Sequence, residues 1–257
     1  MARALAPGPR RSDLVGARSE SSPAPRPEDL ARLAAAAVGL AREAAGDGLL
    51  VGLGSGRAAE AFVRALAAAA GEGLPVRAVP TSTATATLAR GLGLALVELP
   101  AAPLDLTVDG ADEVDPGLDL IKGYGGALAR ERIVAAASRR QVILVTGEKL
   151  VPRLGTRGRL PVEIVPFAHA LCARRLAALG CRPRLRERAG SPFVTDNGNW
   201  ILDCAIEPLD DPAGLEREIR RIPGVLDTGL FLGTAERVLV AVDGEVRVLA
   251  RPGGPAP

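Results

Sequence analysis

The sequence predicts an α/β fold in which a mostly parallel, Rossmann-like sheet carries an inserted ferredoxin-like α+β domain. Short apolar runs alternate with helical periodicity up to about Leu154, as in a parallel sheet with crossover helices. Beyond that point the expected order is strand, helix, strand, strand, helix, strand, which is typical of a split βαβ unit. A final hairpin around Asp243 and Gly244 is expected to return to the first sheet, so the second domain is inserted.

Three segments divide the 257-residue chain. Residues 1–26 are expected to form a disordered arm, residues 27–155 and 234–251 the Rossmann-like catalytic domain, and residues 156–233 the α+β domain. The arm is rich in Pro, Arg, Ser and Ala and has no apolar period. It lacks the apolar core of a secretory signal, whereas a transit peptide and a misplaced start codon both stay open as interpretations.

Apolar spacing predicts the elements of the first domain. A helix begins at Pro27, where a proline and two acids mark a helix start. Leu30, Leu33 and Ala37 then recur at helical spacing. The other elements are expected as helices at 58–70, 81–90 and 127–138, and as strands at 49–51, 76–79, 94–99, 104–109 and 142–145.

The second domain and the closing hairpin follow the same reasoning. Turn residues and apolar runs predict strands at 161–165, 182–186, 193–206 and 225–232, and helices at 168–179 and 212–221. The third of these strands is expected to bend at 196–198. The hairpin that ends the fold comprises strands at 237–242 and 245–250.

Ligands of open parallel sheets bind at the carboxyl ends of the strands. Four segments fall there, at 52–57, 109–113, 122–126 and 147–149. The first is a Gly-rich strand-to-helix turn whose backbone N–H groups suit an anion. A dinucleotide fingerprint needs glycine at Arg57, and the Gly-Lys-Ser/Thr of a P-loop is absent. A phosphate cradle with Arg57 as charge partner and a tight turn without ligand both stay open.

The other segments carry acids and lysines. Asp109 and Asp112 flank two small residues and can hold sugar hydroxyls, bind a metal or cap a helix, but no histidine lies nearby to complete a metal site. Lys122, one of only two lysines, opens a Gly-rich loop. Glu131 falls in the first turn of the next helix, whose dipole favours the ionised carboxylate. Glu131 is therefore either a general base beside a bound sugar or a solvated residue between two arginines.

Five ordered motifs together resemble the type A ribose-5-phosphate isomerase family. They are DGADEVDPGLDLIKGYGGALARERIVAAAS from Asp109, TSTAT from Thr81, LPVEIVPFA from Leu160, TDNGNWILD from Thr195 and GVLDTGLFLG from Gly224. The resemblance implies an aldose–ketose isomerase of the non-oxidative pentose phosphate pathway. Such an enzyme opens the furanose ring and interconverts D-ribose 5-phosphate and D-ribulose 5-phosphate through a cis-enediolate. It implies no cofactor, no metal, and a homodimer or homotetramer.

The resemblance also implies roles for particular residues. Glu131 matches the general base, and Asp109 and Asp112 match acids that contact the sugar hydroxyls and assist ring opening. Lys122 and Lys149 match lysines that stabilise the enediolate oxygen. The residues expected to touch the substrate are Ser55, Gly56, Arg57, Ala58, Asp109, Gly110, Ala111, Asp112, Lys122, Gly123, Tyr124, Gly125 and Lys149. The family usually has GTGST where this chain has GSGRA at 54–58, and glycine where it has Tyr124.

Composition excludes several other classes. A net charge of +2 gives no sign of a nucleic-acid partner, and no apolar run approaches the length of a membrane span. Three cysteines without metal-ligand spacing read as buried residues of a reducing compartment, which agrees with a cytoplasmic enzyme. The competing functions are a sugar-phosphate sensor, which would need a DNA-binding module, and an isomerase of another sugar phosphate.

Overall fold

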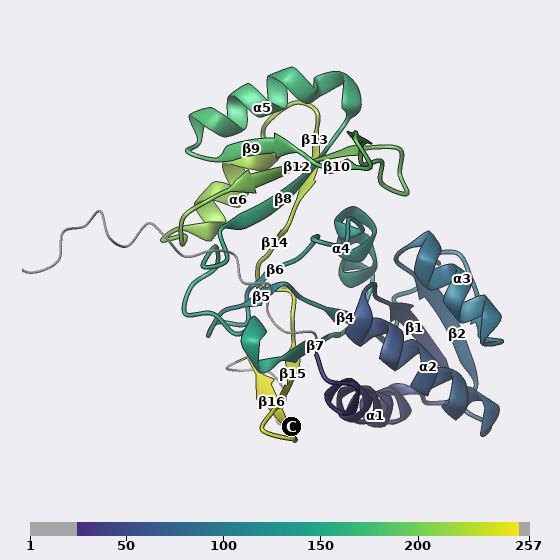
Figure 1. Ribbon diagram of the computed structural model, residues 1–257. Helices are drawn as coiled ribbons and strands as arrows, with labels where there is room; N and C mark the ends of the chain where they lie inside the picture. The colour runs from purple at the N-terminus through teal and green to yellow at the C-terminus, as the bar shows by residue number, and fades with distance from the viewer. Residues whose placement is uncertain (1–24, 252–257) are drawn as a thin grey trace, which may run out of the picture.

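A seven-stranded sheet and a smaller antiparallel domain make up the computed structural model, which describes residues 25–251 (Figure 1). The order in the large sheet is β16-β15-β7-β4-β1-β2-β3, and all neighbours are parallel except β15 and β16. The strands are β1 (Leu49–Leu53), β2 (Val76–Pro80), β3 (Ala95–Leu96), β4 (Leu106–Gly110), β7 (Gln141–Thr146), β15 (Arg237–Val242) and β16 (Glu245–Ala250). The hairpin β15–β16 joins β7, which confirms its predicted return to the first sheet.

Helices cover both faces of this sheet. On one face, α1 (Pro27–Ala44) packs against α2 (Arg57–Gly71), with α3 (Thr83–Gly91) beside α2. Alanines fill much of this layer, and their small side chains let α1 and α2 approach closely. On the other face lie α4 (Leu128–Ala136) and a three-stranded sheet of β14 (Leu230–Phe231), β6 (Leu120–Ile121) and β5 (Glu113–Val114).

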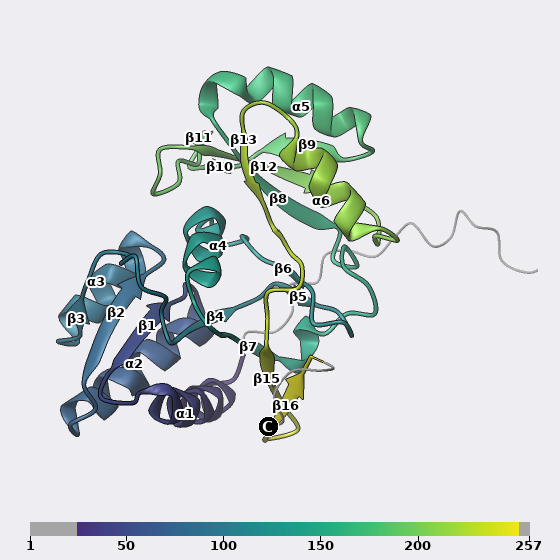
Figure 2. The ribbon, with the colours of Figure 1, turned by 180° about the vertical axis from the view of Figure 1, so that it is seen from behind.

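The antiparallel domain has the expected β-α-β-β-α-β order. Its sheet runs β13-β8-β12-β9, and α5 (His169–Ala178) and α6 (Pro212–Arg220) bury Cys172, Leu176 and Ile219 against it. The strands are β8 (Arg159–Ile164), β9 (Arg182–Leu185), β12 (Trp200–Ala205) and β13 (Val225–Thr228), with a small hairpin of β10 (Glu187–Arg188) and β11 (Ser191–Pro192). In both views α4 lies between this domain and the large sheet (Figures 1 and 2).

Two expected strands are wrong in extent. The strand predicted at 94–99 forms pairs only at Ala95 and Leu96, at the edge of the sheet. The strand predicted at 193–206 begins at Trp200, because the Glu163 carboxylate binds three side chains of residues 195–199 and draws that segment into a loop. Residues 195–199 therefore contact the first domain as a loop and not as part of a strand.

A third expected strand, 225–232, breaks at Gly229. The Gly229 carbonyl accepts the backbone N–H of Lys122, and its own N–H donates to the Pro161 carbonyl. A side chain at this position would overlap the Lys122 carbonyl oxygen. The chain therefore passes from the antiparallel sheet, as β13, to the three-stranded sheet, as β14, and holds the Lys122 loop while it does so.

The predicted domain boundaries, at 155/156 and 233/234, stay a prediction. Of the predicted arm, residues 1–24 lie outside the described residues, whereas Pro25 and Arg26 are included. Arg26 binds Asp29 at 2.8 Å, and its carbonyl accepts the first N–H groups of α1. Helix α1 itself begins at Pro27, the predicted helix start. Across residues 25–251, no helix has both the length and the apolar character to cross a membrane.

Candidate active site

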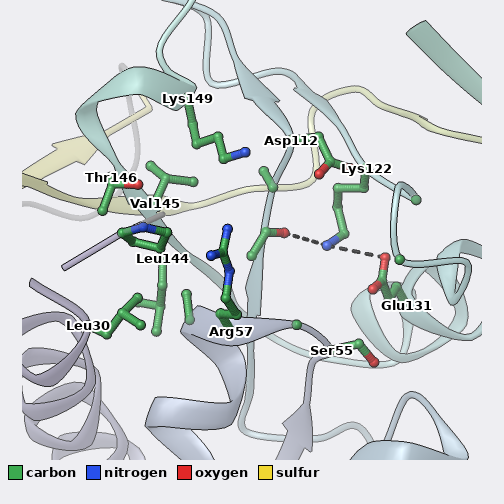
Figure 3. Close-up of a pocket in the computed structure, with 17 residues that line it drawn as sticks. Leu30, Ser55, Arg57, Asp112, Lys122, Glu131, Leu144, Val145, Thr146 and Lys149 are labelled. Atoms are coloured by element: carbon green, nitrogen blue, oxygen red, sulfur yellow. Dashed lines mark hydrogen bonds and ion pairs between the residues drawn. The ribbon is translucent and has the colours of Figure 1, made fainter. Parts of the chain in front are cut away.

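A cavity of about 270 Å³ opens at the carboxyl ends of β1, β4 and β7 (Figure 3). The topology explains its place, because the turns after three parallel strands meet at one edge of the sheet. The predicted residues that line it are Ser55, Gly56, Arg57, Ala58, Gly110, Ala111, Asp112, Lys122, Gly123, Gly125, Glu131 and Lys149. All four segments expected at this edge therefore contribute to one cavity.

Lys122 lies at the cavity between two carboxylates, those of Asp109 and Glu131. Its Nζ lies 3.0 Å from Oδ2 of Asp109 and 3.3 Å from Oε2 of Glu131, and all three side chains are nearly inaccessible to solvent. Nζ also donates to the Gly110 carbonyl. Burial opposes the charge of Lys122, but Asp109 and Glu131 outweigh it and hold the pKa of Lys122 above its usual value. Lys122 is therefore a fixed cation.

Glu131 has the properties of a base rather than of a solvated surface residue. Burial, followed by the nearby charge of Asp109, raises the pKa of Glu131 to about 8. Lys122 opposes this shift, but its charge is shared with Asp109. Oε2 of Glu131 makes no hydrogen bond within the described residues, although it forms the ion pair with Lys122. This oxygen is free to take a proton from a ligand in the cavity.

Asp109 and Asp112 take different positions. Asp109 lies behind the cavity wall, where its Oδ1 accepts the backbone N–H groups of Ser55 and Gly110 at 3.1 and 2.7 Å. Asp112 lines the cavity, and its Oδ2 accepts the Tyr124 N–H at 2.9 Å. Burial raises the pKa of Asp112, with partial opposition from that N–H and from Lys122. Asp109 thus orients its neighbours, while Asp112 faces the ligand space.

The Gly-rich turn brings backbone N–H groups to the cavity. Gly54 lies against Asp109, and a Cβ there would be 2.6 Å from the Asp109 Cα. Gly56 is the N-cap of α2 with φ 88° and supplies no side-chain cap, so the first-turn N–H groups of α2 are available to an anion. The Ser55 hydroxyl instead bonds to Thr81 and Ser82 at 2.9 Å each, which fixes the turn onto α3.

Two cations line the cavity without an ion pair to any residue of 25–251, although the charge of Lys149 acts on Asp112 and partly opposes the burial that raises the pKa of Asp112. Arg57 and Lys149 both point into it (Figure 3), and neither forms an ion pair with any described residue. Lys149 ends the 3₁₀ turn η2 (Gly147–Lys149) that follows β7. With the N-terminus of α2, these side chains give the cavity an excess of positive charge that suits a dianion such as a phosphate ester.

Some expectations and the structure differ. Tyr124 contributes its backbone, but its side chain packs in the antiparallel domain, donates to the Arg159 carbonyl and lies under the Arg159 guanidinium. The cavity wall also includes residues that sequence reasoning missed, namely Pro25, Leu30, Leu144, Val145 and Thr146. Leu144, Val145 and Thr146 are the last residues of β7. Their position at the carboxyl end of a predicted strand could have identified them as cavity residues. Pro25 and Leu30 reach the cavity only through the packing of α1.

No metal centre is built from the residues that the structure describes. Nowhere in residues 25–251 do three His, Cys, Asp or Glu side chains gather as possible ligands. The single histidine, His169, lies edge-on to Trp200 with ring centroids 5.8 Å apart and does not line the cavity. The three cysteines are free and buried in the antiparallel domain.

Comparisons with known proteins agree on one family. Its model, ribose 5-phosphate isomerase A (phosphoriboisomerase A), matches residues 77–245. A ribose-5-phosphate isomerase A from Gloeobacter violaceus is 48% identical over 211 residues, which cover 81% of this chain and 92% of that relative. The solved ribose 5-phosphate isomerase A of Methanocaldococcus jannaschii is 37% identical with a TM-score of 0.81, covering 87% of this chain and 98% of that one. A solved D-ribose-5-phosphate isomerase in complex with phospho-erythronic acid is 34% identical with a TM-score of 0.79, covering 87% and 99%.

Proposed function

The chain belongs to the ribose 5-phosphate isomerase A family, and we propose on that basis that it interconverts D-ribose 5-phosphate and D-ribulose 5-phosphate through a cis-enediolate. The observation that carries the mechanism is Glu131. It is a buried carboxylate with a raised pKa and an oxygen that makes no hydrogen bond, beside the fixed cation Lys122. Proton transfer between adjacent carbons needs a base of this kind next to a positive charge.

Glu131 acts on the open-chain sugar. Its carboxylate takes the hydrogen of carbon 2 as a proton, and the electron pair of that bond forms a double bond between carbons 1 and 2. The oxygen on carbon 1 becomes negative, and the Lys122 ammonium stabilises it. Glu131 then returns the proton to carbon 1 while the hydroxyl proton on oxygen 2 moves to oxygen 1, which leaves a ketone at carbon 2. Atoms and charge balance without a cofactor.

The two aspartates have separate roles in this account. Asp112 faces the cavity with a raised pKa, so it suits proton exchange with the ring oxygen and contact with sugar hydroxyls. Asp109 is a positioning residue, because its carboxylate holds Lys122 and the Ser55 and Gly110 N–H groups from behind the wall. The role of direct substrate contact expected for Asp109 therefore passes to Asp112.

The phosphate is held by the Gly-rich turn. Arg57, the unsatisfied N–H groups at the start of α2, and Lys149 provide its binding groups. The charge of Lys149 also serves the anionic enediolate, since Lys149 lines the cavity and forms no ion pair with any residue of 25–251. A solved relative binds phospho-erythronic acid, a phosphorylated sugar acid, which supports a site that takes both a phosphate and a second negative group.

Assembly and location complete the proposal. We place the enzyme in the cytoplasm, as a homodimer or homotetramer without nucleic-acid or membrane partners. The three free cysteines support a reducing compartment.

Purified protein that converts ribose 5-phosphate to ribulose 5-phosphate would support the proposed function. The assay is repeated after exhaustive treatment with EDTA, and we expect full activity because a lysine, not a metal ion, stabilises the enediolate. Unphosphorylated ribose serves as the control for the phosphate site and should react poorly. No turnover of ribose 5-phosphate by folded protein would overturn the proposal, and activity that EDTA abolishes and a divalent ion restores would overturn the mechanism.

A further inference from the structure

The residues on either side of Glu131 both bind the antiparallel domain. Arg132 donates to Asp227 and to the carbonyls of Thr228 and Leu230, and its guanidinium stacks on Phe231 at 4.1 Å. Arg130 donates from Nε to Oδ1 of Asn197 at 2.8 Å and from Nη2 to the Asp196 carbonyl at 2.9 Å. The two arginines therefore fix the rotation of α4 that points Glu131 at Lys122.

The partner of Arg130 is an unusual loop. Residues 195–199 surround the carboxylate of Glu163, which is completely buried in β8. Its Oε1 accepts hydrogen bonds from Thr195 Oγ1 at 2.9 Å, Asn197 Nδ2 at 3.2 Å and Asn199 Nδ2 at 3.0 Å. Burying a carboxylate is unfavourable unless hydrogen bonds satisfy it, and among the described residues these three bonds satisfy Oε1 alone, since Oε2 makes none. Loss of any of the three would leave the buried charge less satisfied, so they hold the loop in one conformation.

The same loop also reaches the phosphate side of the cavity. Oδ2 of Asp196 accepts the backbone N–H of Thr83 at 2.7 Å, at the start of α3. The N-cap of α3 is Ser82, whose hydroxyl bonds to that of Ser55 in the Gly-rich turn. One loop of the antiparallel domain thus contacts both the helix that carries the base and the helix that supports the turn.

We propose that the loop 195–199, anchored on Glu163, is a positioning device that sets Glu131 against Lys122 through Arg130. The loop residues do not line the cavity and touch no reacting atom. Their effect is transmitted by the two hydrogen bonds of Arg130, which are charge-assisted on the donor side. The inference rests on the proposed function only for its kinetic readout, since the position of Glu131 can also be measured without substrate.

The test uses full-length Arg130→Ala, Asn197→Ala and the double variant. Because small displacements of a catalytic group cost about 10²-fold in rate, we expect each single variant to lose roughly 10- to 100-fold in kcat with KM within about twofold. Arg130→Ala also removes the bond to the Asp196 carbonyl, and Asn197→Ala also removes a bond to Glu163. The double variant should still lose no more than the worse single variant, since the loop acts on Glu131 only through Arg130. Arg139→Ala is the matched control, because Arg139 is an exposed arginine just beyond α4 for which no side-chain bond is found.

A titration of the ¹³C-labelled Glu131 carboxyl separates positioning from a general loss of stability. Displacement of α4 admits water and moves Glu131 from Asp109, Asp112 and Lys122, so its pKa should fall toward the ordinary range in both single variants but not in Arg139→Ala. Unchanged kcat and an unchanged Glu131 pKa in folded Arg130→Ala would overturn the inference, as would additive losses in the double variant. If wild type fails to isomerise ribose 5-phosphate, the proposed function fails, and the titration alone still decides the positioning role.

Discussion

Glu131, Lys122 and Asp109 place two carboxylates around one ammonium group, and all three side chains are nearly inaccessible to solvent. Burial disfavours the ionised form of Glu131 most strongly, and the charge of Asp109 adds to this effect because Lys122 can neutralise only one negative charge, so the pKa of Glu131 is raised. Folding therefore favours the protonated carboxyl. Its contribution to stability is complete below the ordinary pKa of a glutamate and is lost as pH rises toward about 8. At the pH at which Glu131 is ionised and can act as a base, this contribution to the stability of the fold is lost.

The pH dependence of kcat follows from this arrangement. Glu131 works as a base only when ionised, and its ionised fraction rises as pH passes through about 8. We expect kcat to rise with pH by about tenfold per unit on the acid side and to level off above that pKa. Measurement of kcat between about pH 6 and 9.5 checks this. A kcat that is flat across the range, or that falls as pH rises, would contradict the assignment.

Arg57 allows a test of the phosphate site. If its guanidinium binds the phosphate, Arg57→Ala should raise KM for ribose 5-phosphate by roughly 10- to 100-fold, the effect of losing a charged hydrogen bond. Its kcat should change less, because the phosphate is remote from carbons 1 and 2. Arg64→Ala, an exposed position on the same helix and outside the cavity, is the control. A KM equal to that of wild type would assign the phosphate to Lys149 and the backbone N–H groups alone.

At the scale of elements, the turn after β1 depends on the absence of side chains. Gly54 lies so close to Asp109 that Gly54→Ala forces the two backbones apart, and we expect a loss of about 1–3 kcal/mol of stability with a large loss of activity. Gly39 is exposed in α1, and a Cβ there would have nothing within 4 Å, so Gly39→Ala should instead stabilise by about 0.5–1 kcal/mol. Urea unfolding and activity of both variants test this. Equal effects of the two substitutions would disprove the close approach at Gly54.

The parallel sheet and most helices could be predicted because local patterns determine them. Apolar runs followed by helical periodicity gave β1, β2, β4 and β7 with their crossover helices within a few residues. The two-residue strands β5 and β6 could not be predicted, since each is too short to show an apolar pattern and β6 pairs on its other side with β14, more than a hundred residues away. The bend predicted at 196–198 lies within the loop at 195–199, but the full extent of the loop could not be predicted, because the Glu163 side chain that organises it is distant in sequence.

The sequence also predicted part of the candidate active site. Strand ends and Gly-rich turns located Lys122, Lys149 and Arg57 at one edge of the sheet. The sequence alone could not decide between a basic and a solvated Glu131, because the answer depends on its burial beside Lys122 and Asp109, which belong to other elements. It also could not show that the Tyr124 side chain points away from the cavity or that the Ser55 hydroxyl is occupied.

At the scale of the whole molecule, the residues just before α1 contribute to the site and to the helix start. Pro25 lines the cavity and Arg26 supplies the first carbonyl of α1, whereas residues 1–24 carry no apolar period and no site motif. We expect deletion of 1–24 to leave Tm and kcat/KM unchanged, and deletion of 1–26 to lower Tm. A loss of activity in the shorter deletion would show that the preceding residues contribute to the site.

The central claim is that Glu131 moves the proton, and Glu131→Gln tests it most directly. Glutamine keeps the size of the side chain but cannot accept the proton, so kcat for ribose 5-phosphate should fall by about 10²- to 10⁴-fold while the protein stays folded. Glu60→Gln removes an exposed glutamate from the first turn of α2 and should leave kcat unchanged. A Glu131→Gln variant that retains kcat within about threefold of wild type would contradict the account, since a lost general base costs far more than that.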